Sequence, residues 1–200
     1  MTDEDAFSRV KVLLAGGPGV EKTCLVQRYV CGTFKEYNDP LVNYEYVKLI
    51  EAEGHQIHLT VIDENNKEQT LQSIHLCQAY MFILDITNKS SIQELDSIYN
   101  EIKANINEND DFIYSICVNK TDVLNENNQN YITEDQIKEI EAKYSCDVIQ
   151  TSAKMNSGVD DIFSDIVLKY IHSYKPYKYR NNAKSRKHKN KDIVCKCDIE

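Results

Sequence analysis

RVKVLLAGGPGVEKT, residues 9–23, is the stretch of sequence that decides the fold. Its first part, Arg9–Gly16, is an almost continuous apolar run of strand length, which is typical of a strand buried on both faces. A glycine-rich loop follows and opens into Lys22–Phe34, where apolar residues recur at helical spacing: Leu25, Val26, Tyr29 and Val30. A buried strand, a short loop and a helix form the first unit of an α/β fold.

Working outward, the remaining sequence continues to alternate between strand and helix patterns. The predicted strands are Asn43–Glu51, Gln56–Ile62, Ala79–Ile86, Phe112–Val118 and Asp147–Gln150. The predicted helices are Ser90–Ile106, Thr133–Tyr144, which begins with the capping box Thr133-Glu-Asp-Gln136, and Val159–Tyr174. This order predicts an α/β fold: a mostly parallel six-stranded sheet with about five helices on its two faces and one antiparallel edge strand.

The loop after the first strand carries most of the phosphate-loop pattern G-x-x-x-x-G-K-[ST]. Gly16, Lys22 and Thr23 match this pattern, whereas Glu21 replaces its second glycine. Backbone N–H groups of such a loop, together with the helix N-terminus, bind phosphates. With Glu21 in place, this motif alone leaves a second interpretation open, a glycine-rich turn followed by a solvated lysine.

Two later segments favour the phosphate-binding interpretation. NKTD, Asn119–Asp122, ends the fifth predicted strand, and TSAK, Thr151–Lys154, follows the last one. Ligand sites of open α/β sheets lie at these carboxyl ends of the strands. With the three motifs in this order and spacing, the chain from about Arg9 to Tyr174 resembles the Ras-type small GTPases. The resemblance implies the P-loop NTPase G-domain fold.

The resemblance also implies which residues bind a guanine nucleotide, GTP or GDP. Asp122 would accept hydrogen bonds from guanine N1–H and the 2-amino group, the Ala153 N–H would donate to O6, and the stem of Lys120 would cover the base. Phe34 would pack against the base, although a core role for Phe34 is also open. The implied nucleotide-binding set is Gly17, Gly19, Val20, Glu21, Lys22, Thr23, Cys24, Phe34, Asn119, Lys120, Asp122, Ser152, Ala153 and Lys154. Mg²⁺ would be bound by Thr23 directly and by Asp63 through a water molecule.

The chain departs from the family where the γ-phosphate would be sensed. Leu41 follows Pro40 at the position of a Mg²⁺-binding threonine, and leucine cannot bind a hard cation. Asn66 replaces a glycine, and Lys67 replaces the glutamine that orients the attacking water. Two classes of function therefore stay open: a nucleotide-dependent switch with slow GTP hydrolysis, and a pseudo-GTPase scaffold that does not cycle.

The resemblance places a G domain at residues 9–174, which leaves an N-terminal extension (1–8) and a tail (175–200) whose charge is basic. The net charge is −9, yet the tail contains nine Lys/Arg against three Asp/Glu. An acidic body disfavours nucleic-acid binding, whereas a basic tail favours an anionic inner membrane leaflet. Cys197 begins a C-a-a-X-like ending and is the candidate lipid acceptor, with a solvated, unmodified tail as the alternative. We expect a cytoplasmic protein at a membrane face, with effector and exchange-factor partners that the sequence does not identify.

Overall fold

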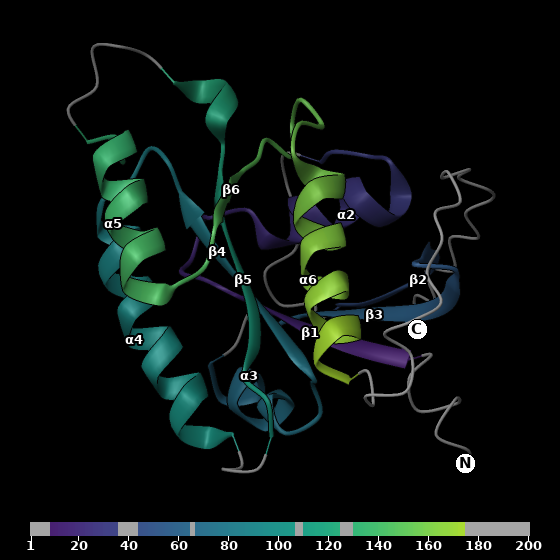
Figure 1. Cartoon of the computed structure of the whole chain (residues 1–200). Helices are drawn as coiled ribbons and strands as arrows, with labels where there is room; N and C mark the ends of the chain where they lie inside the picture. Colours follow the sequence, from purple (N-terminus) through teal and green to yellow (C-terminus); the bar gives the residue numbers. More distant parts are fainter. Residues whose placement is uncertain (1–8, 36–43, 65–66, 107–109, 125–129, 175–200) are drawn as a thin grey trace.

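The computed structural model describes residues 9–35, 44–64, 67–106, 110–124 and 130–174. They form one six-stranded sheet in the order β2-β3-β1-β4-β5-β6 (Figure 1). Five strands run parallel, and β2 pairs antiparallel with β3 at one edge. Their bounds are β1 Arg9–Ala15, β2 Tyr44–Ala52, β3 His55–Asp63, β4 Ala79–Asp85, β5 Ile113–Asn119 and β6 Val148–Gln150. The predicted α/β sheet with one antiparallel edge strand is confirmed.

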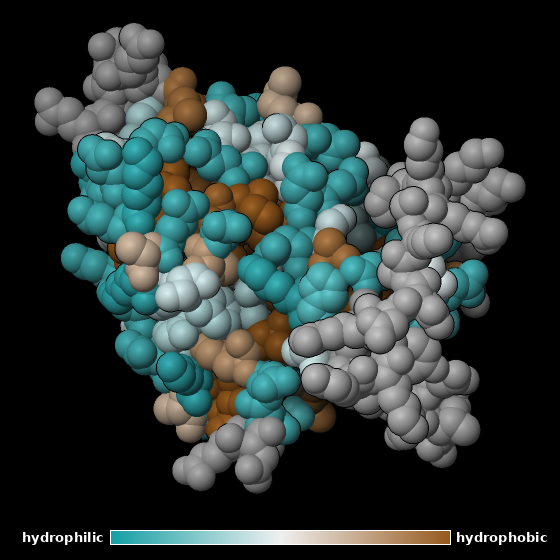
Figure 2. All heavy atoms as spheres, viewed as in Figure 1, coloured by the Kyte–Doolittle hydropathy of each residue, from teal (hydrophilic) through white to brown (hydrophobic). Residues whose placement is uncertain are grey.

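In the described parts of the chain, five α-helices cover the two faces of the sheet. On one face α2 (Lys22–Cys31) and α6 (Val159–Tyr174) enclose a core with β1, β3 and β4. On the other face α3 (Lys67–Ile74), α4 (Ser90–Asn105) and α5 (Glu134–Tyr144) enclose a second core. A short 3₁₀ helix, η1 (Thr121–Val123), follows β5. Figure 2 shows hydrophilic residues over most of the surface that α5 and α6 present in this view, with hydrophobic residues gathered between them.

Burial on both faces explains why the central strands have little polar alternation. Every residue of β4 is buried, so an uninterrupted apolar run is the pattern that this position requires. The two helices of the first core meet through stacked rings of Tyr29 and Phe163, whose centroids lie 3.9 Å apart. Such aromatic pairs combine a large buried area with a specific geometry, and they fix α6 against α2.

The predicted strands and helices agree with the observed ones to within one residue at each end, apart from two helices. The first helix ends at Cys31, three residues before the predicted end at Phe34, because Gly32 adopts a left-handed conformation with φ 67°. Helix α3 was not among the predicted segments, since its eight residues contain few apolar side chains. The capping box of α5 is confirmed: Thr133 accepts a hydrogen bond from the Gln136 N–H, and the Gln136 side chain accepts one from the Thr133 N–H.

The carboxyl ends of the parallel strands lie together at one end of the sheet, and the loops that follow them contain the phosphate-loop, NKTD and TSAK motifs. Strand β1 lies between β3 and β4, where the order of strands reverses direction. In open α/β sheets this point of reversal is where a ligand binds. Among the described helices, none combines the length and apolarity needed to cross a lipid bilayer.

Candidate functional site

The loop from Gly16 to Glu21 joins β1 to α2 and keeps a phosphate-loop backbone. A Cβ atom on Gly16 would lie 2.5 Å from the Ile83 carbonyl oxygen, so no larger residue fits there. Gly19 has φ 81°. Glu21, at the place of the pattern's second glycine, has φ 67° and ψ 43°, a left-handed conformation that is unfavourable for a residue with a side chain. The backbone therefore stays glycine-like although the residue is not glycine.

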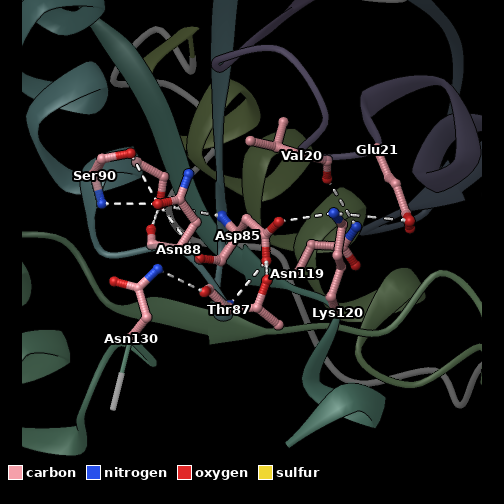
Figure 3. Close-up of polar contacts among 10 residues, drawn as sticks. Val20, Glu21, Asp85, Thr87, Asn88, Ser90, Asn119, Lys120 and Asn130 are labelled. Atoms are coloured by element: carbon pink, nitrogen blue, oxygen red, sulfur yellow. Dashed lines mark hydrogen bonds and ion pairs between the residues drawn. The ribbon is translucent and has the colours of Figure 1, made fainter. Parts of the chain in front are cut away.

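The side chain of Glu21 faces the residues expected to bind the base. Its carboxylate lies 3.9 Å from the Lys120 ammonium, which also binds Asp85 at 2.7 Å (Figure 3). Burial raises the pKa of Glu21 above its ordinary value; the charge of Lys120 opposes this rise, while Asp122 and Asp85 add to it and Lys154 counters it. The extra carboxylate thus lies at the nucleoside end of the loop.

Lys22, the phosphate-loop lysine, folds back over its own loop. Its ammonium donates to the carbonyl oxygens of Gly16 at 3.0 Å and Gly17 at 3.4 Å. Burial lowers the pKa of Lys22, and the carboxylates of Asp63 and Glu94 oppose this effect. Glu94 reaches the loop from α4, because a Cβ on Gly17 would lie only 1.7 Å from its Oε2 atom. A cation partly removed from water beside phosphate-binding amides is suited to an anion.

Thr23 and Asp63 come together across the site as a candidate cation-binding pair. The Thr23 hydroxyl donates to Asp63 Oδ2 at 2.5 Å. Asp63 is fully buried, and among the described residues its Oδ1 atom has no hydrogen-bond partner. Burial raises the pKa of Asp63, although the Thr23 hydrogen bond and the charge of Lys22 lower it. A buried carboxylate oxygen beside a hydroxyl is suited to bind Mg²⁺. This ion usually takes only one or two oxygens from the protein and completes its coordination shell with water and phosphate oxygens.

Asn119 connects the phosphate loop with the second base motif. Its Nδ2 donates to the Val20 carbonyl at 3.1 Å (Figure 3). Its Oδ1 accepts from the Ala153 N–H and from the Thr151 hydroxyl, both at 3.2 Å. Asn119 is completely buried, so each of these bonds replaces one with water. One amide group thereby holds three loops in register.

The two base motifs also contact each other directly. The Ser152 hydroxyl donates to Asp122 Oδ1 at 2.5 Å, and the Thr121 N–H donates to the Thr151 carbonyl at 3.1 Å. Behind the second motif, Gly158 has φ 66°, and a Cβ there would lie 2.2 Å from the Gln150 carbonyl oxygen. The loop that carries TSAK is therefore tightly constrained on both sides.

Three residues at the site were not predicted: Glu94, described above, Asp85 and Arg28. Asp85 ends β4 and holds Lys120, and its position at the carboxyl end of a strand was a usable signal. Arg28 of α2 donates to the Ala153 carbonyl, a contact across 125 residues that no local pattern indicates. Phe34 is half-buried against the α2–α6 core, and the Arg28 guanidinium lies 6.0 Å from its ring centroid.

Several predicted residues lie outside the described parts of the chain. These are Pro40 and Leu41, Asn66, and the tail with Cys197. Lys67 is the first residue of α3, but its side chain is also outside the described parts. The residues expected at the γ-phosphate therefore remain sequence predictions. The structure places the phosphate-loop residues Gly17–Cys24, the NKTD residues Asn119–Asp122 and the TSAK residues Ser152–Lys154 together at the carboxyl ends of the parallel strands.

Comparisons with known proteins agree with this arrangement. The Ras family model matches residues 11–172. The GTP-binding protein Di-Ras1 of Homo sapiens is 27% identical over 164 residues, which cover 78% of this chain and 79% of that protein. The GTP-binding protein Di-Ras2 of Pongo abelii is 28% identical over 171 residues, covering 84% and 83% respectively. With its fold, its loop geometry and a family match over most of its length, the chain belongs to the Ras family of small GTPases.

Proposed function

We propose that the chain is a guanine-nucleotide-dependent switch in intracellular signalling or membrane traffic. The observation that carries this proposal is the junction at Asn119. A single buried side chain binds the phosphate loop through Val20 and the TSAK loop through Thr151 and Ala153. Groups that would contact phosphate and groups that would contact the base are thereby held at fixed spacing. A site organised in this way suits a guanosine di- or triphosphate.

Base selection would come from Asp122 and Ala153. The Asp122 carboxylate suits the N1–H and 2-amino donors of guanine, and adenine offers neither of them. A site built around specific hydrogen bonds discriminates strongly against an analogue that lacks them. Ser152 supports this role, because its hydroxyl holds one oxygen of Asp122.

Mg²⁺ would be bound by Thr23, with Asp63 acting through a water molecule. When present, the ion would neutralise phosphate charge. The unpartnered Oδ1 of Asp63 supports this assignment. Hydrolysis is expected to be slow because Lys67 lacks the acceptor that a water-orienting glutamine supplies.

A pseudo-GTPase that binds nucleotide weakly and does not cycle is the second candidate function. The position of the Glu21 carboxylate favours it. This group lies among Lys120, Asp122 and Lys154, where a nucleoside would have to fit. A nucleotide entering the site would need to displace that side chain or bind beside it.

Membrane attachment through the tail completes the proposal. The tail's nine Lys/Arg attract anionic lipids, each by roughly 1 kcal/mol near the surface. One lipid chain on Cys197 together with this basic segment is enough for stable anchoring. The effector and exchange-factor proteins would act at that surface.

Nucleotide titration of Asp122→Asn tests the proposed base recognition. Asparagine can donate to the 2-oxo group of xanthine, so the variant should lose affinity for GDP and gain affinity for xanthosine diphosphate. Asp147→Asn, an exposed carboxylate next to the amino end of β6, is the matched control and should leave both affinities unchanged. An unaltered preference in Asp122→Asn would show that Asp122 does not contact the base.

A further inference from the structure

The side chain of Arg28 joins two walls of the candidate base site. Its Nε donates to the Ala153 carbonyl at 2.8 Å and its Nη2 donates to the Lys154 carbonyl at 3.2 Å. Its Nη1 donates to the Gly32 carbonyl at 2.7 Å. The same guanidinium lies against the ring of Phe34. Arg28 thus connects the TSAK loop to the segment that carries the aromatic ring.

These contacts restrain the backbone of Ala153 at its carbonyl group, in addition to the restraint at its N–H. The Ala153 N–H is held by Asn119, and the Ala153 carbonyl is held by Arg28. Because one anchor restrains the peptide before Ala153 and the other restrains the peptide after it, both backbone dihedrals of this residue are determined. Ala153 is almost completely buried. If the Arg28 side chain were removed, water could not replace its hydrogen bond to the Ala153 carbonyl unless the loop rearranged.

A guanidinium is the only side chain that can make this set of contacts. Its planar fork presents five N–H donors in a rigid arrangement and also stacks on aromatic faces. Three of its nitrogens bind three carbonyl oxygens in this structure. A lysine ammonium at the same place would keep the charge but concentrate its donors at one point.

We propose that Arg28 is a positioning residue that sets how the site recognises the 6-oxo group of a purine. This inference rests on the proposed guanine-nucleotide function. Arg28 does not touch the base. It holds Ala153 so that its N–H, which donates to Asn119 Oδ1 in this structure, can also donate to a 6-oxo group and finds no acceptor in a 6-amino group. The 2-amino group is sensed by Asp122, whose partner is the Ser152 hydroxyl, so recognition at the two positions is separable.

Lys48 provides a matched control for the loss of a stabilising cation. Its ammonium donates to the Tyr29 carbonyl of α2 at 2.8 Å and lies 3.6 Å from the Tyr29 ring centroid. Like Arg28, it combines a contact with a backbone carbonyl and a contact with an aromatic ring. Unlike Arg28, Lys48 lies on β2, and neither of these two contacts involves Ala153. Its removal should lower stability without altering base recognition.

The test measures dissociation constants of the full chain for three nucleotides: GDP, inosine diphosphate and 2,6-diaminopurine riboside diphosphate. The ratio of the affinity for GDP to that for the diaminopurine nucleotide reports position 6 together with the N1–H that Asp122 would read, and the ratio of the affinity for GDP to that for inosine diphosphate reports position 2. A change in the first ratio alone is therefore assigned to position 6. In Arg28→Ala the preference for GDP over the diaminopurine nucleotide should fall about tenfold or more, which is the scale of one charge-assisted hydrogen bond. The preference for GDP over inosine diphosphate should change by less than about twofold, which is smaller than the effect of losing one hydrogen bond.

Two further variants separate positioning from a purely structural role. Arg28→Lys should recover most of the thermal stability but not the position-6 ratio, and Lys48→Ala should keep both ratios at the wild-type values. A wild-type chain that discriminates at position 6, with Arg28→Ala discriminating equally well, overturns the inference alone. Equal loss of both ratios in Arg28→Ala and Lys48→Ala also overturns it, because that result indicates general destabilisation. A wild-type chain that binds none of the three nucleotides overturns the proposed function and the inference with it.

Discussion

Glu21→Gly should increase both the stability of the chain and its affinity for guanine nucleotides. Glu21 has a left-handed backbone, which costs roughly 1–2 kcal/mol for a residue other than glycine. Glycine removes this cost but adds roughly 0.5–1 kcal/mol of unfolded-state entropy. The ion pair with Lys120 is partly exposed, at 33% for the Glu21 side chain, so its loss costs well under about 1 kcal/mol. The free energy of unfolding should therefore rise by about 0.5 kcal/mol, which follows from these ranges.

The gain in affinity should be larger than the gain in stability. At an effective dielectric constant near 20, a carboxylate and a phosphate charge repel by roughly 4 kcal/mol at about 4 Å and by half as much at twice that distance, so we take roughly 2 kcal/mol for Glu21. Removing it should tighten binding by about 30-fold. GDP and a non-hydrolysable GTP analogue should gain by similar factors, because the phosphate loop surrounds the α- and β-phosphates of both. Isothermal calorimetry with each nucleotide measures the two factors.

Two companion variants show which property of Glu21 matters. Glu21→Gln keeps the side chain and removes its charge, so it separates electrostatic repulsion from steric obstruction. Ser145→Gly relieves a second left-handed residue, with φ 50° at the end of α5, outside the site. It should stabilise the fold without changing nucleotide affinity. If Glu21→Gly stabilises the chain and leaves both affinities unchanged, the carboxylate does not limit binding and the pseudo-GTPase alternative loses its main support.

Three further predictions concern the base loop, hydrolysis and localisation. Gly158→Ala should destabilise the chain by more than about 2 kcal/mol and weaken GDP binding, because its Cβ would collide with the Gln150 carbonyl; thermal denaturation and titration measure the two effects. An intact fold with wild-type affinity would contradict the close approach of these two backbone segments. Lys67→Gln should accelerate single-turnover GTP hydrolysis in Mg²⁺, and no acceleration would show that another residue orients the water. A tagged full-length chain should fractionate partly with membranes, and Cys197→Ser should release much of it into a salt-sensitive pool. A wild-type chain found only in the soluble fraction would rule out anchoring.

Most of the architecture could be predicted from the sequence because its signals are local. Apolar runs such as Ala79–Asp85 indicate strands buried on both faces, and the Thr133–Gln136 capping box marks a helix start. The order of these elements predicts the sheet, and the sheet brings its carboxyl-end loops together. The approximate position of the site follows from that order alone.

The details of the site could not be predicted because they depend on side-chain directions and distant contacts. The sequence showed that Glu21 replaces a glycine, but it did not determine that the carboxylate faces Lys120. Arg28 and Ala153 are 125 residues apart and carry no shared pattern. Helix α3 has too few apolar residues for its periodicity to stand out.

The close approach of Glu94 to Gly17 has a consequence for how the family's sequences vary. The Glu94 carboxylate occupies the space where a side chain at position 17 would begin. A relative with alanine at the position of Gly17 must therefore have a shorter or displaced residue at the position of Glu94. Because the atoms in the way are the far end of a flexible side chain, the residue at position 17 should be coupled to the conformation of Glu94, although the two lie far apart in the sequence. Helix α4 contributes no motif residue, yet one of its side chains would then have to adjust to the residue at position 17 of the phosphate loop.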